Sequence, residues 1–205
     1  MSVCQPLTIC MVDNDPVSAI IYPGGMHMRK NKTAYITRCA LLAAIICLIS
    51  PIAIPVGAVP VTLSVFAVLL ASLMLDWKAA AAAVGIYVLI GCCGLPVFSG
   101  GQGGVAMLFG PTGGYIWSYI PMSALVSKFG KGKPPWKACM ASLGGLIVCY
   151  VCGTVQYALV SGSGFAAALG VCVLPFAGFD VVKIVCAVFL SHRIEKRLQD
   201  AGHSA

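Results

Sequence analysis

Long runs of apolar residues, separated by short polar or glycine-rich segments, make up most of the chain. Six such runs can be delimited, at residues 35–54, 61–75, 79–95, 111–126, 138–160 and 165–192. Most of them approach the roughly 20 apolar residues that a transmembrane helix needs. The pattern therefore predicts an all-α, polytopic membrane protein, a bundle of about six transmembrane helices.

Polar residues, prolines and glycines mark the ends of these runs. Asp76, Trp77 and Lys78 stop the second run, and the fourth begins near Pro111, a residue favoured at the first helical position. Pro175 and Gly178 interrupt the last run. We expect that helix to break there and to restart near Gly178.

The amino-acid composition supports a membrane protein. Sixty per cent of the residues are hydrophobic and only 9% are charged, whereas a soluble domain carries roughly 25% charged residues. Lipid accepts an apolar surface that water would not, so the lipid bilayer is the expected environment. The net charge of +7 could suggest a nucleic-acid ligand, but the placement of the charges indicates membrane orientation instead, and no nucleic-acid partner is expected.

The positive charges fall on one side of a six-helix topology. Of the 13 lysine and arginine residues, all except Lys183 lie before or at the start of the first run, between runs two and three, between runs four and five, or after the last run. The three opposite connections carry no charge of either sign. By the positive-inside rule, both termini are expected in the cytoplasm of a bacterial cell, with the protein in the cell membrane.

The N-terminal segment 1–27 is weakly patterned and lacks the basic-then-apolar order of a signal peptide. A basic stretch begins at Met28 and leads into the first apolar run, and the upstream Gly24 and Gly25 could be encoded by a ribosome-binding sequence. We therefore expect translation to start at Met28 or Met26. Residues 28–205 are expected to form a single transmembrane domain.

Two ionisable residues lie well inside an apolar run. Asp180 and Lys183 are three positions apart, so they share one face of a helix. An ionisable group at membrane depth costs about 2.5–3.5 kcal/mol on insertion scales and usually faces a cavity or the protein interior. The pair is therefore a candidate ligand site near the first turn of the last helix. A purely structural ion pair is the alternative.

A glycine-rich connection follows the third run. It contains Gln102 among several glycines and continues to Gly113, Gly114 and Tyr115 at the start of the fourth run. Glycine lets the backbone approach a ligand or another helix closely, and tyrosine adds an aromatic face with a polar tip. The pattern is typical of a lid or pocket wall on the outer side, and equally of a plain flexible linker.

The remaining motifs do not indicate catalysis or a metal centre. Cys149 and Cys152 form a CxxC, but there is no second CxxC and no nearby histidine, so apolar filling of a helix is the favoured interpretation. The chain has no GxxxxGK[ST], HExxH or GxSxG motif. Neither an enzyme activity nor a cofactor is expected.

Two pairs of small residues at helical spacing could allow close helix packing. Ala40 and Ala44 lie on the first run, and Ala79 and Ala83 lie on the third. Small side chains let membrane helices approach closely. Packing within the chain and contact with a partner subunit are both compatible with this pattern.

Three segments in order resemble the BioY family: residues 94–101, residues 110–115, and the Leu-Pro-Phe followed by Asp180 and Lys183 in residues 174–183. The resemblance runs from about Met28 to Arg197. BioY proteins are biotin-binding S components of energy-coupling factor transporters. The resemblance implies a six-helix membrane bundle with cytoplasmic termini that holds the vitamin near the outer face.

The resemblance also assigns roles to particular residues. Ala40 and Ala44 match the motif that docks on the membrane coupling (T) subunit, which works with a pair of ATPases. One departure concerns Ile116, where some relatives carry a basic residue, and this leaves the partner of the biotin carboxylate open between Lys183 and backbone N–H groups. The residues that the resemblance places at the biotin site are Asp180, Lys183, Gln102, Gly113, Gly114 and Tyr115.

Three alternatives to this function remain. The chain could be a solitary biotin transporter that works without ATPases, or an S component for another vitamin. An intramembrane enzyme would use Asp180 as an acid or base, but Lys183 is the only further catalytic group available inside the apolar runs.

Overall fold

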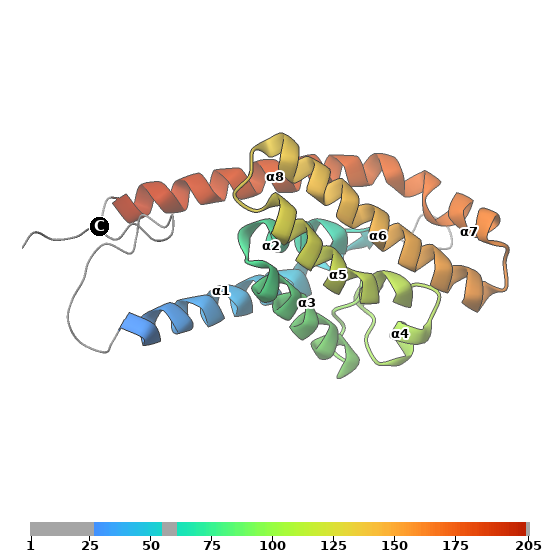
Figure 1. The fold of residues 1–205 in the computed structure, drawn as a ribbon. Coiled ribbons are helices and arrows are strands. Elements are labelled where there is room, and N and C mark those ends of the chain that lie inside the picture. The colour runs from blue at the N-terminus through green and yellow to red at the C-terminus, as the bar shows by residue number, and fades with distance from the viewer. Residues whose placement is uncertain (1–26, 55–60, 204–205) are drawn as a thin grey trace, which may run out of the picture.

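The computed structural model describes residues 27–54 and 61–203, which form a helical bundle (Figure 1). The predicted N-terminal extension therefore lies outside the described residues, except for His27. The six longer helices are α1 (His27–Ile49), α2 (Ser64–Met74), α3 (Trp77–Cys92), α5 (Gly113–Gly130), α6 (Pro135–Ser161) and α8 (Leu174–His203). The short elements are α4 (Ala106–Phe109), α7 (Phe165–Cys172), the 3-10 turn η1 (Ser99–Gly101), and the antiparallel strands β1 (Ala53–Ile54) and β2 (Val61–Thr62). The all-α prediction is confirmed, and each predicted run overlaps one of the longer helices.

The last apolar run contains two helices, as its predicted break implies, but the break lies before Pro175 and Gly178. The break lies at Val173, whose backbone leaves the helical region at φ −120° and ψ −49°. Pro175 is the second residue of α8, where a missing N–H costs no intrahelical hydrogen bond. Gly178 lies inside α8 and does not restart the helix. Asp180 is therefore in the second turn of α8, directly after the first turn, near which it was expected.

Helix α2 is the core of the bundle. It packs against α1, α3, α5 and α8, and nearly all of its side chains are buried. Its 11 residues, at 1.5 Å each, span about half of a hydrocarbon layer roughly 30 Å thick. The predicted second run is thus helical over only part of its length, because its first residues belong to β2.

The two pairs of small residues have different surroundings. Ala79 and Ala83 are fully buried, and α3 packs on α1, where the Cys39 thiol donates a hydrogen bond to the Ala79 carbonyl at 3.0 Å. Ala40 and Ala44 lie on the exposed side of α1. The pair on α3 therefore serves packing within the chain, whereas the pair on α1 is free to contact another molecule.

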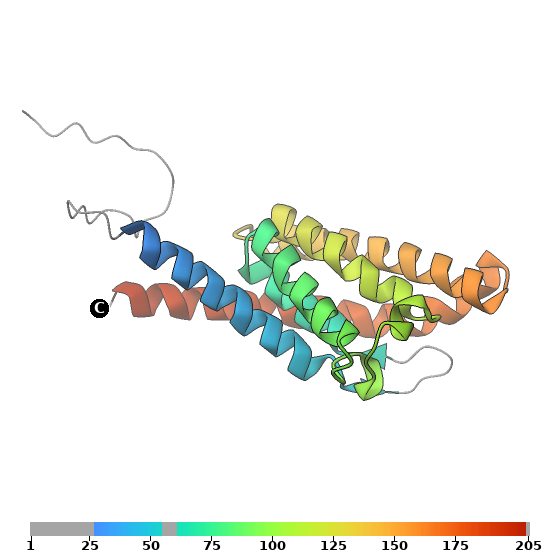
Figure 2. The same cartoon turned by 90° about the horizontal axis from the view of Figure 1, so that it is seen from below.

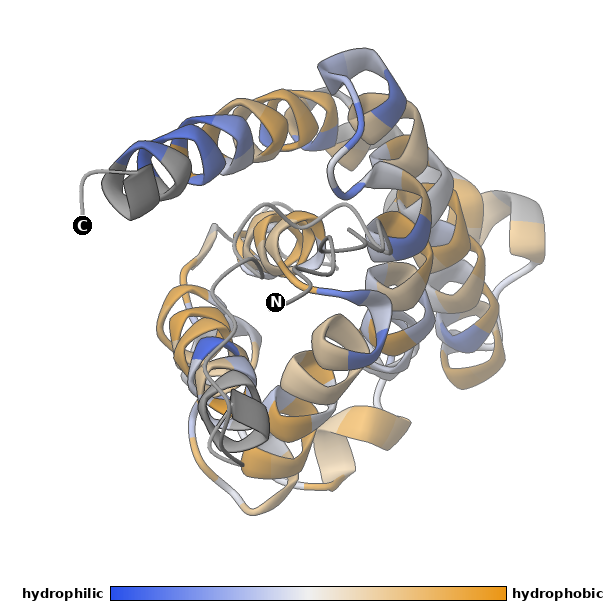
Figure 3. Cartoon of the chain, turned by 60° about the vertical axis from the view of Figure 1, so that its left-hand side comes forward, coloured by the Kyte–Doolittle hydropathy of each residue, from blue (hydrophilic) through white to orange (hydrophobic). Residues whose placement is uncertain are grey.

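The outward faces of the helices are apolar. On α6, exposed large side chains recur every three or four residues, and Figure 3 shows hydrophobic colour over much of the helical ribbon. In a soluble protein such a stripe would face the core. Within the described part of the chain, only Pro135–Ser161 is both long and apolar enough to cross a membrane, and the apolar helices Ser64–Met74 and Trp77–Cys92 are shorter. The exposed residues of the α6 stripe include Met140, Leu143, Ile147, Val151, Val155 and Leu159.

The charged connections meet at one end of the bundle. The Lys131 ammonium, after α5, forms an ion pair with Asp76, between α2 and α3, at 2.6 Å. The Ser127 hydroxyl also donates to the Leu75 carbonyl at 2.5 Å. The start of α1 and the end of α8 lie toward this same end, while α4 and α7 lie toward the other (Figures 1 and 2). The structure thus groups the charged segments as a six-helix topology requires.

Candidate functional site

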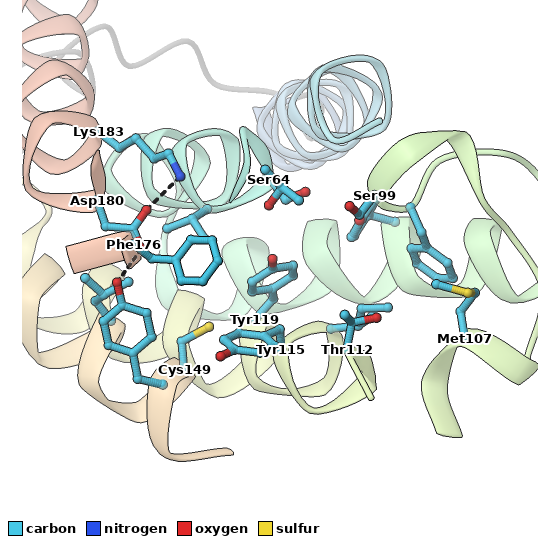
Figure 4. Close-up of a pocket in the computed structure, with 17 residues that line it drawn as sticks. Ser64, Ser99, Met107, Thr112, Tyr115, Tyr119, Cys149, Phe176, Asp180 and Lys183 are labelled. Atoms are coloured by element: carbon cyan, nitrogen blue, oxygen red, sulfur yellow. Dashed lines mark hydrogen bonds and ion pairs between the residues drawn. The ribbon is translucent and has the colours of Figure 1, made fainter. Parts of the chain in front are cut away.

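A pocket lies between the helices toward the end that holds the uncharged connections (Figure 4). It contains about 670 Å³ of space that no protein atom fills, and part of this space is open to solvent. The starts of α2, α5 and α8, the later parts of α3 and α6, and the connection between α3 and α5 all contribute side chains. This place in the bundle makes it the candidate binding site.

One end of the pocket is formed by a buried carboxylate with two partners. Asp180 is only 3% exposed. The Lys183 ammonium lies 2.7 Å from its Oδ1, and the Tyr150 hydroxyl donates a hydrogen bond to its Oδ2 at 2.5 Å (Figure 4). All three residues line the pocket, so this end presents an acceptor flanked by two donors.

The amphipathic pattern of α8 aims the pair into the pocket. Phe176, Asp180 and Lys183 recur at three- and four-residue spacing and line the pocket, whereas Phe179 and Val182 on the adjoining face are exposed. Residues three and four apart share a helix face. The predicted pairing of Asp180 with Lys183 on one face is therefore what the structure shows.

Aromatic side chains form much of the remaining wall. Tyr87 and Phe98 meet edge to face, with ring centroids 5.7 Å apart and planes at 87°. Phe98 is fully buried over Gly91, where an added Cβ would overlap the ring. Tyr115 and Tyr119 line the pocket from α5. Such a wall suits a ligand with an apolar ring system.

The connection after α3 forms part of the pocket wall, which was one of the two predictions for it. Gln102, however, does not reach the pocket. Gly100 and Gly101 adopt positive φ angles of 70° and 73°, and the turn is closed by a bridge between Phe98 and Gln102. Phe98 and Ser99 line the pocket, while Gln102 is exposed and absent from its lining. The turn thus separates Gln102 from the residues it was expected to join.

Gly113 and Gly114 are buried between helices and do not line the pocket. A Cβ on Gly113 would overlap the Leu108 carbonyl, and a Cβ on Gly114 would lie 2.5 Å from the Cys152 carbonyl oxygen. These glycines therefore let the start of α5 approach α4 and α6 closely. They place Tyr115, which does line the pocket.

Two residues of this region were not identified from the sequence. Tyr150 could not be identified from the sequence, because a tyrosine within an apolar run has no pattern that distinguishes a binding residue from a packing residue. Gln156 had a signal, since it is a lone amide within an apolar run. Its Nε2 donates to the carbonyls of Leu108 and Gly110 at 2.7 and 2.9 Å, which ties the segment around α4 to α6.

The cysteine pair of α6 is partly integrated into the pocket. Cys149 lines it, is 1% exposed, and accepts a hydrogen bond from the Ser118 hydroxyl at 3.1 Å. Among the residues that the structure describes, no group of three or more histidine, cysteine or acidic side chains could hold a metal ion. The site is therefore suited to binding an organic ligand through hydrogen bonds and apolar contacts.

Comparison with known proteins gives a consistent result. A model of the BioY family matches residues 26–200. The probable biotin transporter BioY of Pyrococcus horikoshii is 38% identical over 164 residues, which cover 80% of this chain and 98% of the relative. Biotin transporter BioY2 of Lactococcus lactis is 36% identical, with 77% and 88% covered. Biotin transporter BioY of Thermotoga maritima is 34% identical, with 78% and 94% covered.

A solved structure shares the fold. The crystal structure of the S-component for biotin from an ECF-type ABC transporter superposes with a TM-score of 0.76 at 25% sequence identity. The match covers 82% of this chain and 93% of that one.

Proposed function

The chain belongs to the BioY family, and we propose that it is the substrate-binding S component of a biotin uptake transporter. It is a multi-pass membrane protein and not an enzyme. The observation that carries the proposal is the pocket in which Asp180, Lys183 and Tyr150 form one polar end beside an aromatic wall.

The polar end matches the ureido ring of biotin. That ring has two N–H donors and one carbonyl acceptor. The oxygens of Asp180 accept the N–H groups, and the Lys183 ammonium and Tyr150 hydroxyl can donate to the carbonyl. In the structure Tyr150 and Lys183 both bond to Asp180, which supports a site whose buried charges are paired and ordered before biotin enters.

The wall matches the rest of the ligand. The thiophane ring and aliphatic tail of biotin are apolar, and apolar or aromatic side chains surround the space beyond Asp180. Tyr115, Tyr119 and Phe176 supply aromatic faces, and Ile116 and Leu146 supply aliphatic ones. Small-molecule binding sites are commonly apolar with a few convergent polar groups.

The other predicted site residues act less directly. Gly113 and Gly114 position Tyr115 through the close contact of α5 with α6. Gln102 is exposed in the structure and is absent from the pocket lining, so its predicted contact with biotin has no support from the geometry.

We assign the pocket to the outer face of the membrane and both termini to the cytoplasm. The support is the grouping of the lysines and arginines at the opposite end of the bundle, together with the positive-inside rule. The chain then captures biotin from outside the cell.

A coupling module completes the transporter. Ala40 and Ala44 on the exposed side of α1 form the surface for the membrane coupling (T) subunit, because small residues let helix backbones approach closely. The chain has no GxxxxGK[ST] motif, so a pair of ATPases supplies the work. Uptake of biotin by cells that lack the coupling module would instead favour a solitary transporter.

The test is native mass spectrometry of the detergent-purified protein with and without biotin. We expect a one-to-one adduct that desthiobiotin displaces and that thiamine and riboflavin do not. A folded protein that takes up no biotin but binds another vitamin would overturn the assignment of the substrate.

A further inference from the structure

The pocket continues from Asp180 and Lys183 to a second polar region, where the side chains are uncharged. Ser99, from the connection after α3, and Thr112, just before α5, lie away from Lys183 in Figure 4. We propose that the hydroxyls of Ser99 and Thr112 receive the carboxylate of biotin, and that Lys183 does not. The proposal rests on the function proposed above and assigns the orientation of the ligand within the site.

The charged end is poorly suited to a second carboxylate. Of the described residues that line the pocket, Lys183 is the only cation, and its ammonium is already bound to Asp180 at 2.7 Å. A ligand carboxylate placed there would meet the Asp180 charge in a buried site, and two neighbouring carboxylates disfavour each other's ionisation. The ureido ring has no charge and meets no such repulsion.

Ser99 offers an unused hydrogen-bonding group at the other end. Its hydroxyl oxygen is buried and has no hydrogen-bond partner among the residues that the structure describes. A buried polar group without a partner destabilises the protein unless a ligand or water satisfies it. A ligand oxygen that reaches this end of the pocket would supply the missing partner.

Thr112 adds a second hydroxyl in a favourable electrostatic position. It is the N-cap residue of α5, an 18-residue helix, and its side chain makes no capping hydrogen bond within the described structure. The N-terminus of a helix carries a partial positive charge that stabilises an anion. The hydroxyl of Thr112 is thus available at the end of α5 that attracts a carboxylate.

The residues between the two ends suit the middle of the ligand. Tyr115 and Tyr119 lie between Asp180 on one side and Ser99 on the other in Figure 4. An extended biotin with its ureido ring at Asp180 would place its apolar parts along these rings. Its carboxylate then lies at the hydroxyl end, without a cationic side chain beside it.

The test compares two ligands on a set of variants. One ligand is biotin, and the other is an analogue with the same rings and a tail that ends in a methyl group. In Ser99→Ala and in Thr112→Val we expect the Kd for biotin to rise about 10- to 100-fold, the range for hydrogen bonds to a charged group. The Kd for the methyl-ended analogue should change less than about threefold, because it has no carboxylate to lose contacts.

Control variants separate a lost contact from a damaged fold. Ser99→Thr keeps a hydroxyl and should retain most of the biotin affinity, and Ser161→Ala removes an exposed hydroxyl outside the pocket and should leave both affinities unchanged. Asp180→Asn should weaken both ligands, since both carry the ureido ring.

Three results would overturn the orientation. One is unchanged biotin affinity in both Ser99→Ala and Thr112→Val, and another is an equal loss for the two ligands in those variants. The third is a loss in Lys183→Ala that affects biotin and spares the methyl-ended analogue, which would place the carboxylate on Lys183. Absence of biotin binding by the unaltered protein would overturn the proposed function itself, and the orientation with it.

Discussion

The hydroxyl of Tyr150 on α6 donates a hydrogen bond to the buried carboxylate of Asp180 on α8, with 2.5 Å between the two oxygens. The bond joins two helices that both line the pocket, and it leaves Lys183 to hold the other carboxylate oxygen. Tyr150 therefore fixes the direction in which Asp180 faces the ligand.

Replacing Tyr150 by phenylalanine tests this relationship. The change removes only the hydroxyl, so the Asp180 carboxylate loses one of its two partners and its fixed orientation. We expect the biotin Kd to rise about 5- to 50-fold and the unfolding free energy to fall by about 1–3 kcal/mol, as for other hydrogen bonds to buried charges. Isothermal titration and thermal unfolding in detergent measure both quantities.

Tyr157→Phe is the matched control, because Tyr157 is also on α6 and lies near Phe176 but does not line the pocket. Its biotin affinity should stay within about twofold of the unaltered protein, since no pocket contact of this hydroxyl is removed. Equal effects in the two variants would contradict a specific role for Tyr150.

Asp180→Asn and Lys183→Ala should each weaken biotin binding while the protein stays in the membrane. The first change removes the negative charge that accepts the N–H groups, and the second removes a donor and leaves Asp180 without its ion-pair partner. We expect a loss of about 10- to 100-fold in each case. Titration of the purified variants, after membrane fractionation, measures this loss, and normal affinity in both would refute the site.

Gly114→Ala should destabilise the protein. The added methyl group would lie 2.5 Å from the Cys152 carbonyl oxygen, a contact that only separation of α5 from α6 can relieve. Overpacking of this kind costs about 1–3 kcal/mol, so the midpoint of thermal unfolding should fall by several degrees. Biotin binding should weaken as well, because Tyr115 moves with the start of α5.

The nearby Gly110→Ala serves as the control for that substitution. A Cβ at Gly110 would lie 3.5 Å from its nearest neighbour, the Met107 carbonyl oxygen, which is an ordinary contact. Its unfolding midpoint should match that of the unaltered protein. A normal midpoint in Gly114→Ala would show that the α5–α6 contact tolerates more space than the structure indicates.

Ala44→Leu should separate partner binding from biotin binding. Ala44 is exposed on α1 and does not line the pocket, so the larger side chain should leave the biotin Kd within about twofold, as is usual for surface changes. It should reduce co-purification with the coupling subunit and the uptake of biotin. Ala82→Leu, at an exposed position on α3, is the control and should retain both.

Failure of Ala44→Leu to reduce co-purification would exclude Ala44 from the partner surface. The same result for the combined Ala40→Leu and Ala44→Leu variant would extend that conclusion to the whole pair. Loss of biotin binding in either variant would instead indicate that the surface of α1 affects the pocket.

Much of the fold could be predicted because it depends on properties of continuous segments. The apolar runs located the longer helices, and the placement of lysines and arginines anticipated which connections share one end. The break of the last run was predicted around Pro175 and Gly178, whereas it lies slightly earlier, at Val173. Pro175 lies in the first turn of α8. Proline is tolerated there because the N–H groups of the first turn have no partner within the helix, whereas inside a helix the missing N–H removes a hydrogen bond.

The candidate site was only partly predictable. Asp180 and Lys183 stood out because charges inside an apolar run are rare, and their spacing placed them on one face. Gln102 was expected beside them because of the resemblance to the BioY family. The positive φ angles of Gly100 and Gly101 turn the chain there, and the direction of such a turn cannot be read from the presence of glycine alone.

The sequence by itself determined the membrane class, the approximate helix positions, the one-sided charge and the buried ion pair, because each follows from hydrophobicity or charge within one segment. Only the tertiary structure decided that Tyr150 meets Asp180, 30 positions further along the chain, and that Gly114 faces α6 rather than the pocket. Those outcomes depend on which faces of separate helices pack together. That choice is made by the fit of side chains across the whole bundle, and no single segment specifies it.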